Sequence, residues 1–249
     1  MKSRVLEGMT CEECKVVKLC LGSTVSDNSY TKLNHLIKYV QTYVSGEHLY
    51  LAPNKPDYLY ALHSGCCKEY FIDQNGEEVI TAFYLPGDLI GLEYCYKNYS
   101  RFNVSFVENS TVCLIPLSEL YHENSYLAPI TARQAISHYL TQVSLPHTTS
   151  AQSRVAAFFL ELIYRQKIFY QRETPLPFPM ILLDISNKIG VANETLSRML
   201  HKFRDQHILV LEHHAIVNYD LAKLEEIAGV EFISTFYPSY KPQSKAQGN

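Results

Sequence analysis

Residues 183–205 read LDISNKIGVANETLSRMLHKFRD, and this stretch contains two short helical patterns that meet at a glycine. Asp184 can cap the first helix, and Gly190 permits the turn before the second helix, which is expected over residues 193–205. The second helix has an inward stripe at spacings of three and four residues, formed by Leu196, Met199, Leu200 and Phe203. The stretch therefore predicts a helix-turn-helix.

The outward face of the second helix carries side chains that can read base edges in a DNA major groove. Arginine binds guanine through two acceptors, and glutamate accepts a hydrogen bond from the cytosine amino group. The expected DNA-binding residues are Asn193, Glu194, Ser197, Arg198 and Lys202. An ordinary surface helix with a solvated polar face is the alternative. Residues 209–217 predict a β-hairpin after the helix, which favours a winged helix-turn-helix.

Ahead of this element, helical spacing gives way to short β-branched or aromatic segments. A first amphipathic helix is expected over residues 30–44, and residues 46–117 then read as an all-β barrel or roll. The expected strands are His48–Leu51, Tyr58–Leu62, Cys67–Ile72, Val79–Tyr84, Asn103–Val107 and Thr111–Ile115. Asn75 and Gly76 favour a hairpin turn between the third and fourth of these strands.

Helical spacing returns from Ser118 and is interrupted at Pro146, because proline removes a backbone donor and breaks a helix. A further helix is expected from Ala151 to about Gln166, followed by a proline-rich extended loop over residues 174–179. The predicted organisation has five parts: a cysteine-containing segment (1–29), a sensor β-roll (30–120), a dimerisation helix region (121–150), a winged helix-turn-helix (151–230) and a disordered tail (231–249).

The composition limits what kind of protein this is. The chain has 249 residues, 47% of them hydrophobic, which is enough for one large or two modest domains. Its formal net charge of -3 argues against a protein that coats nucleic acid over its whole surface, so one local element must meet DNA. The chain has no long apolar run and no apolar signal region after Met1, which predicts a cytoplasmic protein without membrane contact.

Seven cysteines in a reducing compartment are expected as thiols rather than disulfides. Three of them form a C-x2-C-x5-C array near the N-terminus: Cys11, Cys14 and Cys20. Thiolates are soft ligands that suit zinc, copper(I) and iron–sulfur clusters, and a tetrahedral site or a four-iron cluster takes four of them. The array is one ligand short and does not distinguish these metals. Unselected thiols on a disordered segment are the alternative.

The order of roll, helix and winged helix-turn-helix resembles the CRP/FNR family of bacterial transcription regulators over about residues 11–229. Residues 86–91 (PGDLIG) are similar to a turn in the family's roll, and Arg154 followed by Ala156-Ala157-Phe158 resembles the start of its hinge helix. Residues 194–198 (ETLSR) match the E-T-x-S-R signature of its recognition helix. The resemblance implies an α+β chain with a cyclic-nucleotide-binding-like β-roll, a connecting dimerisation helix and a winged helix-turn-helix.

Within the family, the chain looks most like the oxygen-responsive FNR branch. FNR proteins bind a 4Fe-4S cluster through three N-terminal cysteines at this spacing and one cysteine in a strand that reads V-C-x-I-P. Residues 112–116 read VCLIP, so the resemblance implies an oxygen-labile 4Fe-4S cluster held by Cys11, Cys14, Cys20 and Cys113. It also implies a homodimer that reads an FNR-like TTGAT palindrome in double-stranded DNA, acts with RNA polymerase, and loses DNA affinity when oxygen attacks the cluster.

Some positions depart from the family pattern. Pro146 falls where the dimerisation helix is continuous, and Ala192 stands where a capping threonine is usual, although Asn193 is able to cap. The wing tip at residues 212–214 (EHH) lacks basic residues. Residues 100–102 (SRF) do not match the Arg-Ser or Arg-Thr pair with which a cyclic-nucleotide regulator binds phosphate.

Two other functions fit the same scaffold. A cluster-free CRP-like regulator would respond to a small molecule in the roll, or would switch by thiol–disulfide or zinc chemistry. A β-barrel enzyme with an accessory DNA-binding domain is the other, but His48 and His63 are isolated in the roll and no nucleophile–base arrangement stands out. No enzymatic activity is therefore expected. Cys66 and Cys67 are expected to have packing roles.

Overall fold

The computed structural model describes residues 10–17, 19–20, 30–37, 39–55, 57–95, 99–120, 131–132 and 150–229. It confirms the predicted fold class, with a β-roll followed by a long helix and a helix-turn-helix. The chain divides into two compact units. The first consists of residues 1–143 with 179–188, and the second of residues 144–178 with 189–249.

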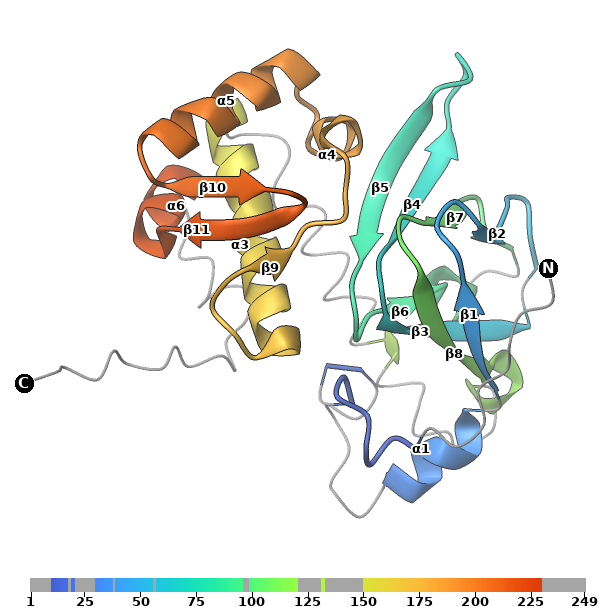
Figure 1. Ribbon diagram of the computed structural model, residues 1–249. Coiled ribbons are helices and arrows are strands. Elements are labelled where there is room, and N and C mark those ends of the chain that lie inside the picture. The colour runs from blue at the N-terminus through green and yellow to red at the C-terminus, as the bar shows by residue number, and fades with distance from the viewer. Residues whose placement is uncertain are drawn as a thin grey trace, which may run out of the picture. The chain divides into compact units, whose positions relative to one another are not determined.

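The roll in the first unit consists of two four-stranded antiparallel sheets (Figure 1). The first sheet has the order β1-β8-β3-β6, with β1 (Tyr39–Tyr43), β8 (Ser110–Pro116), β3 (Tyr58–Ser64) and β6 (Leu89–Ile90). The second sheet has the order β2-β7-β4-β5, with β2 (His48–Tyr50), β7 (Asn103–Phe106), β4 (Cys67–Ile72) and β5 (Glu78–Tyr84). Short 3-10 helices, η3 (Leu92–Cys95) and η4 (Leu117–Leu120), follow β6 and β8. All six predicted strands are present, with small differences at their ends.

Several aromatic side chains are buried inside the roll. Tyr60, Tyr84 and Phe106 belong to one buried cluster together with Leu62. Successive residues of a strand face opposite sides of the sheet. Tyr60 and Leu62 of β3 therefore face this aromatic cluster, whereas Leu59 and Ala61 belong to a second cluster.

The second cluster forms where α1 (Tyr30–Leu36) packs on the roll. Leu33 and Leu36 of this helix are buried in the same cluster as Cys113 of β8. The prediction that this helix continues to residue 44 is wrong. The helix ends at Leu36, and residues 39–43 form β1, which pairs with β8. Val40 is β-branched, which favours a strand, and its partner there is Cys113.

The first unit also contains residues 182–188 of α4 (Leu182–Ile189), which pack on the edge strand β5. The Asn187 side chain accepts a hydrogen bond from the Ile80 amide at 2.8 Å and donates one to the Glu78 carbonyl at 2.7 Å. The predicted capping role of Asp184 is wrong, because α4 begins two residues earlier and Asp184 lies in its first turn. Its carboxylate instead pairs with Lys68 at 3.2 Å.

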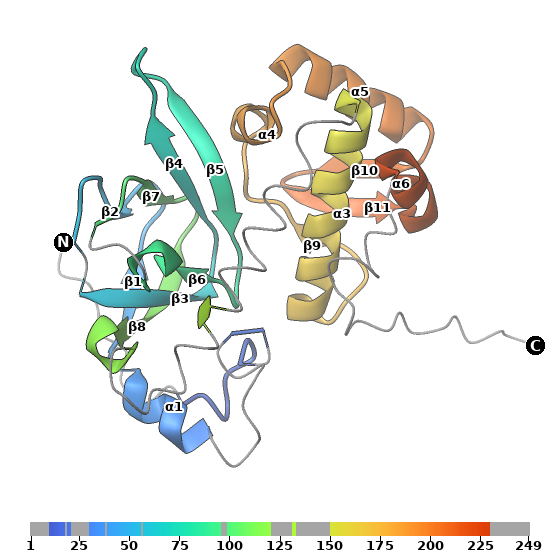
Figure 2. The same ribbon diagram turned by 180° about the vertical axis from the view of Figure 1, so that it is seen from behind.

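The second unit is built around α3 (Ala151–Tyr170), which crosses one face of a small sheet, as the opposite views in Figures 1 and 2 show. The sheet has the order β10-β11-β9, with β10 (Leu209–Glu212), β11 (Ala215–Tyr219) and β9 (Leu176–Pro177). The remaining helices are α5 (Asn193–Asp205) and α6 (Leu221–Ala228). β9 lies in the segment predicted as an extended loop, and α6 has no counterpart among the predicted elements.

The Arg154 side chain ties α3 to the turn that precedes α5. Its Nε donates to the Ile189 carbonyl at 2.9 Å, and its Nη2 donates to the Gly190 carbonyl at 3.0 Å. Gly190 has a φ of +64°, the left-handed conformation that glycine adopts without strain. The predicted turn residue therefore lies in the second unit together with the helix that follows it.

Two predicted features fall outside the described residues. One is the interrupted dimerisation region with Pro146, of which only residues 131–132 and 150 are described. The other is the tail at residues 231–249.

Candidate functional site

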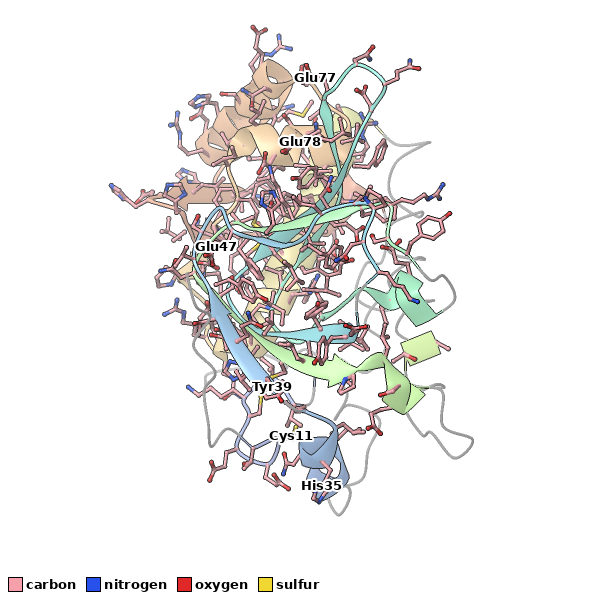
Figure 3. The ribbon with its side chains drawn as sticks, turned by 90° about the vertical axis from the view of Figure 1, so that its right-hand side faces the viewer. Cys11, His35, Tyr39, Glu47, Glu77 and Glu78 are labelled. Carbon is pink, nitrogen blue, oxygen red and sulfur yellow. The ribbon has the colours of Figure 1, made fainter. Side chains whose placement is uncertain are left out.

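The three N-terminal cysteines lie on a segment of tight turns at one end of the roll. The Cys14 amide donates to the Cys11 carbonyl at 3.3 Å, and the Cys20 amide donates to the Val16 carbonyl at 2.9 Å. The Cys11 amide also donates to Oδ1 of Asn34 in α1 at 2.6 Å, and Figure 3 shows Cys11 beside this helix. The segment is thus held both by its own turns and by α1.

A glycine of the roll allows this segment to approach closely. Gly87 has a φ of +98°, and a Cβ at this position would lie only 2.5 Å from the Cβ of Leu19. Leu19 immediately precedes Cys20. Any side chain at position 87 would therefore displace the part of the segment that carries Cys20.

The fourth predicted cysteine comes from a central strand of the first sheet. Cys113 lies on β8 between Val40 of β1 and Ala61 of β3, and it is only 8% exposed. One cavity brings all four cysteines together. The residues that line it are Cys11, Cys14, Val16, Val17, Cys20, Leu33, Ile37, Ala61, Leu62, His63, Cys113 and Ile115.

Three of the thiols that line this cavity, those of Cys11, Cys14 and Cys113, are protonated at neutral pH. Burial raises the pKa of the Cys113 thiol to about 12 and that of the Cys11 thiol to about 11, and neighbouring Cys14 adds to both shifts. Burial also raises the pKa of the Cys14 thiol. A metal that binds these groups as thiolates must therefore displace their protons.

The donor chemistry of the cavity fits a soft metal centre. Four sulfur atoms from two distant parts of the chain meet among largely apolar walls, and thiolate ligation of this kind suits zinc, copper(I) and iron–sulfur clusters. Among the described residues, no three His, Cys, Asp or Glu side chains lie close enough together to hold a metal ion as they stand. The four cysteines thus share a cavity without forming a closed coordination set.

Two other cysteines have the packing role predicted for them. Cys66 and Cys67 are fully buried, and Cys67 belongs to the aromatic cluster inside the roll. The Cys66 amide donates to the Ser110 hydroxyl at 3.2 Å. Neither residue lines the cavity of the four cysteines.

Sequence reasoning missed two residues of the cavity region, His63 and Gly87. His63 looks isolated in the sequence, yet it lines the cavity. The alternation of β3 is the signal that would have placed it there, because positions 59, 61 and 63 share one face of the strand. The close contact of Gly87 with Leu19 has no signal in the sequence, because the two residues lie in unrelated segments.

The helix α5 carries the side chains predicted to read DNA. Asn193, Glu194, Arg198 and Lys202 are exposed, and Ser197 is half-buried. On the opposite face, Leu196 and Phe203 are fully buried, and Met199 and Leu200 are half-buried. The helix is therefore amphipathic in the way its sequence predicts, with a row of polar groups free to meet a ligand.

The start of α5 lacks a side-chain cap. Ala192 is the N-cap residue, and within the described residues no side chain accepts a hydrogen bond from the first-turn amides at this position. The alternative that Asn193 caps the helix is wrong, because Asn193 is its first residue.

The wing tip between β10 and β11 carries two exposed histidines. His213 and His214 have φ values of 45° and 60°, an uncommon conformation for residues other than glycine. The tip therefore meets any ligand with imidazole groups rather than with the lysines or arginines that usually contact phosphate.

Comparisons with known proteins identify both parts of the chain. Residues 40–123 match the cyclic nucleotide-binding domain, and residues 153–227 match the Crp-like helix-turn-helix domain. The chain is 32% identical over 230 residues to the fumarate and nitrate reduction regulatory protein of Vibrio cholerae, covering 88% of this chain and 90% of that protein. The chain belongs to the CRP/FNR family of transcription regulators.

Other CRP/FNR proteins agree with this assignment. The chain is 30% identical to the anaerobic regulatory protein of Pasteurella multocida, over 88% of this chain and 82% of that protein. Among solved structures, FixK2 from Bradyrhizobium japonicum superimposes with a TM-score of 0.63 at 26% identity, over 76% of this chain and 96% of that chain. A CooA mutant from Carboxydothermus hydrogenoformans superimposes with a TM-score of 0.59 at 16% identity, over 90% of this chain and 98% of that chain, and this likeness concerns the fold alone.

As a CRP/FNR protein, the chain is a DNA-binding transcription regulator, and the relatives it matches are regulators rather than enzymes. In the part of the chain that the structure describes, no helix is both long and apolar enough to cross a membrane.

Proposed function

We propose that this regulator senses oxygen or redox state through a 4Fe-4S cluster held by Cys11, Cys14, Cys20 and Cys113. The observation that carries the proposal is the shared cavity, in which a cysteine from β8 meets the three cysteines of the N-terminal segment. The names of the matched relatives, which include an anaerobic regulatory protein, support the same sensing role. When bound, such a cluster supplies a centre that dioxygen can oxidise.

The protein's own residues hold and shield this centre. Cys113 stands on a strand fixed by neighbours on both sides, so it gives the site a rigid wall. Cys11, Cys14 and Cys20 come from a short segment that is held by hydrogen bonds to Asn34 of α1 and by a close contact with Gly87 of the roll. Loading releases the thiol protons, and the apolar side chains around the sulfurs limit the access of water.

We also propose that the regulator binds DNA as a homodimer at an FNR-like TTGAT palindrome. Glu194, Ser197 and Arg198 would read base edges from the exposed face of α5, with Asn193 and Lys202 beside them. Loss of the cluster would weaken the dimer and so lower the affinity for two half-sites. The further partner is RNA polymerase, and the place of action is the cytoplasm, where both the polymerase and the DNA are found.

The structure favours a metal centre bound by the cysteines over a small molecule bound inside the roll as the signal that the regulator senses. Arg101, in the segment where a cyclic-nucleotide regulator carries a phosphate-binding arginine, is exposed. Tyr60, Tyr84 and Phe106 occupy the interior of the roll. These observations favour the four cysteines as the sensor.

The test is anaerobic reconstitution with iron and sulfide, followed by absorption spectroscopy and by iron and acid-labile sulfide analysis. The wild-type protein should hold four of each per chain, as a 4Fe-4S cluster requires. Cys113→Ala should lose both. The matched control is Cys67→Ala, which also removes a buried strand thiol but lies outside the cavity.

Each outcome separates the proposal from its alternatives. A colourless wild-type protein without iron and sulfide would refute the cluster. Stoichiometric zinc in that protein would favour a zinc switch, and a disulfide formed in air without any metal would favour thiol switching. Full cluster retention in Cys113→Ala would refute the fourth ligand alone.

A further inference from the structure

The cavity of the four cysteines contains one further polar side chain, that of His63. Strand β3 pairs with β8 through Leu62 opposite Val112 and Ser64 opposite Thr111, so two steps along β3 match one step along β8. His63 is therefore the extra residue of a β-bulge. Bulges of this kind re-aim a side chain, and they are frequent beside functional sites.

His63 lies on the face of β3 that meets the cysteines. Ala61 lies two residues earlier on the same strand, directly opposite Cys113, and it belongs to the cluster that includes Cys11 and Cys113. His63 continues that face and lines the cavity with all four cysteines. It brings a ring nitrogen to a wall that is otherwise built from thiols and apolar side chains.

The imidazole of His63 is half-buried and free to bind at this place. No hydrogen-bond partner for it is found among the described residues. An imidazole ring carries at least one N–H donor whether it is neutral or protonated. Hydrogen bonds to the sulfur atoms of an iron–sulfur centre are one of the means by which a protein sets its reduction potential.

We propose that His63 is a positioning residue of the cysteine site, whose ring N–H donates a hydrogen bond to a sulfur atom of the bound centre and slows its oxidation by dioxygen. This inference rests on the proposed cluster. The N–H stabilises negative charge on the sulfur, so the centre gives up an electron less readily. In the oxidation, one electron passes from the centre to dioxygen, which is reduced to superoxide.

The experiment compares three variants after anaerobic reconstitution. His63→Leu removes the donor and keeps an apolar side chain of similar size, whereas His63→Gln keeps a side-chain N–H. His48→Leu is the matched control, because His48 is an exposed histidine of the same roll on β2, outside the cavity. Iron and sulfide content, circular dichroism and the rate of absorbance loss in air-saturated buffer are measured for each.

His63→Leu should load as much iron and sulfide as the wild type but bleach about two- to tenfold faster, as expected for the loss of one hydrogen bond. His63→Gln should recover much of the difference, and His48→Leu should match the wild type. Bleaching of His63→Leu at the wild-type rate would overturn the inference and leave the cluster proposal intact. A folded His63→Leu protein without iron would also overturn it, because His63 would then be a ligand. A wild-type protein without iron would refute the cluster itself.

Discussion

A single missing side chain, at Gly87, determines how closely the cysteine segment approaches the roll. Gly87→Ala places a methyl group 2.5 Å from the Cβ of Leu19, in addition to the cost of its φ of +98°. A residue forced into such a backbone conformation costs about 1–3 kcal/mol. We expect Gly87→Ala to lower the free energy of unfolding by at least this amount and to reduce iron retention after reconstitution.

The control for this prediction is Gly76→Ala in the β4–β5 hairpin. Gly76 has a φ of +84°, but nothing lies within 4 Å of the position that its Cβ would take. Gly76→Ala should therefore show the cost of the backbone conformation without loss of iron. Equal iron content in the two variants would show that the contact with Leu19 does not position the cysteines.

A second residue-scale feature is the buried carboxyl group of Glu69, which makes stability depend on pH. Burial raises the pKa of Glu69, although the hydroxyls of Thr81 and Tyr84 donate to its two oxygens at 2.7 and 2.9 Å. The folded protein therefore holds this proton more tightly than the unfolded chain. The contribution of the group to the free energy of unfolding is greatest below the unfolded pKa, and it falls as pH rises through the folded pKa.

Glu69→Gln removes this titration and keeps a side chain of the same shape. Relative to the wild type, the variant should gain stability as pH rises from about 4, near the unfolded pKa of a glutamate, to 7. Thermal unfolding of the cluster-free protein across this range measures the difference. The exposed Glu77 supplies the control Glu77→Gln, and parallel curves for the wild type and Glu69→Gln would contradict the prediction.

At the scale of the element, the uncapped start of α5 is a site where stability can be gained. Ala192 has the extended backbone of an N-cap residue, with φ of -65° and ψ of 141°, but its methyl group cannot accept a hydrogen bond. Ala192→Ser supplies an acceptor for a first-turn amide, which typically stabilises a helix by about 1 kcal/mol.

This gain should raise the midpoint of thermal unfolding by about 2–4 °C. The control is Ala222→Ser, an exposed position inside α6, where serine has a lower helix propensity than alanine and supplies no N-cap. An equal or lower midpoint for Ala192→Ser than for the wild type would show that water already satisfies the first-turn amides.

The predictions that agree with the structure concern segments in which the spacing of apolar residues fits either a helix or a strand, but not both. Residues 193–205 repeat apolar side chains every three or four positions, and they form α5 with the predicted ends. Residues 39–43 are predicted as helix, because their apolar positions fit the helical spacing of residues 30–36, and this prediction is wrong. These residues form a strand because they pair with β8, and the local spacing of apolar residues does not show such long-range pairing.

The same distinction applies to the site. The spacing of Cys11, Cys14 and Cys20 is visible in the sequence. Cys113 is predicted as the fourth ligand only through a family resemblance, because its position near the other three cysteines depends on how β8 pairs in the sheet. His63 remained hidden for a related reason. It lies on the same face of β3 as Ala61, but the spacing within β3 does not show that this face meets the N-terminal cysteines and Cys113, because that depends on pairing with β8 and on a distant segment.

At the scale of the whole molecule, the proposed sensor site and the proposed DNA-reading helix belong to different units of one chain. The cysteine cavity lies in the first unit, and α5 lies in the second. Under the proposed function, the state of the cluster controls whether two chains form a dimer, and the dimer controls the affinity for DNA. A dimer reads two half-sites at once, and linking two weak readers raises the overall affinity about 10²- to 10⁴-fold.

This coupling predicts that oxygen acts on palindrome binding far more than on half-site binding. The anaerobic, cluster-loaded protein should bind a duplex with two TTGAT half-sites tightly, and exposure to air should weaken that binding by up to about 10²- to 10⁴-fold. A duplex with one scrambled half-site should be bound weakly in both states, because a single α5 reads it. Fluorescence anisotropy at constant salt, with sedimentation velocity on the same samples, measures affinity and assembly together.

Cys67→Ala should respond to air as the wild type does, whereas Cys113→Ala should behave as the air-treated protein from the start. Equal loss of affinity for both duplexes would mean that oxygen alters the reading helix itself rather than the dimer.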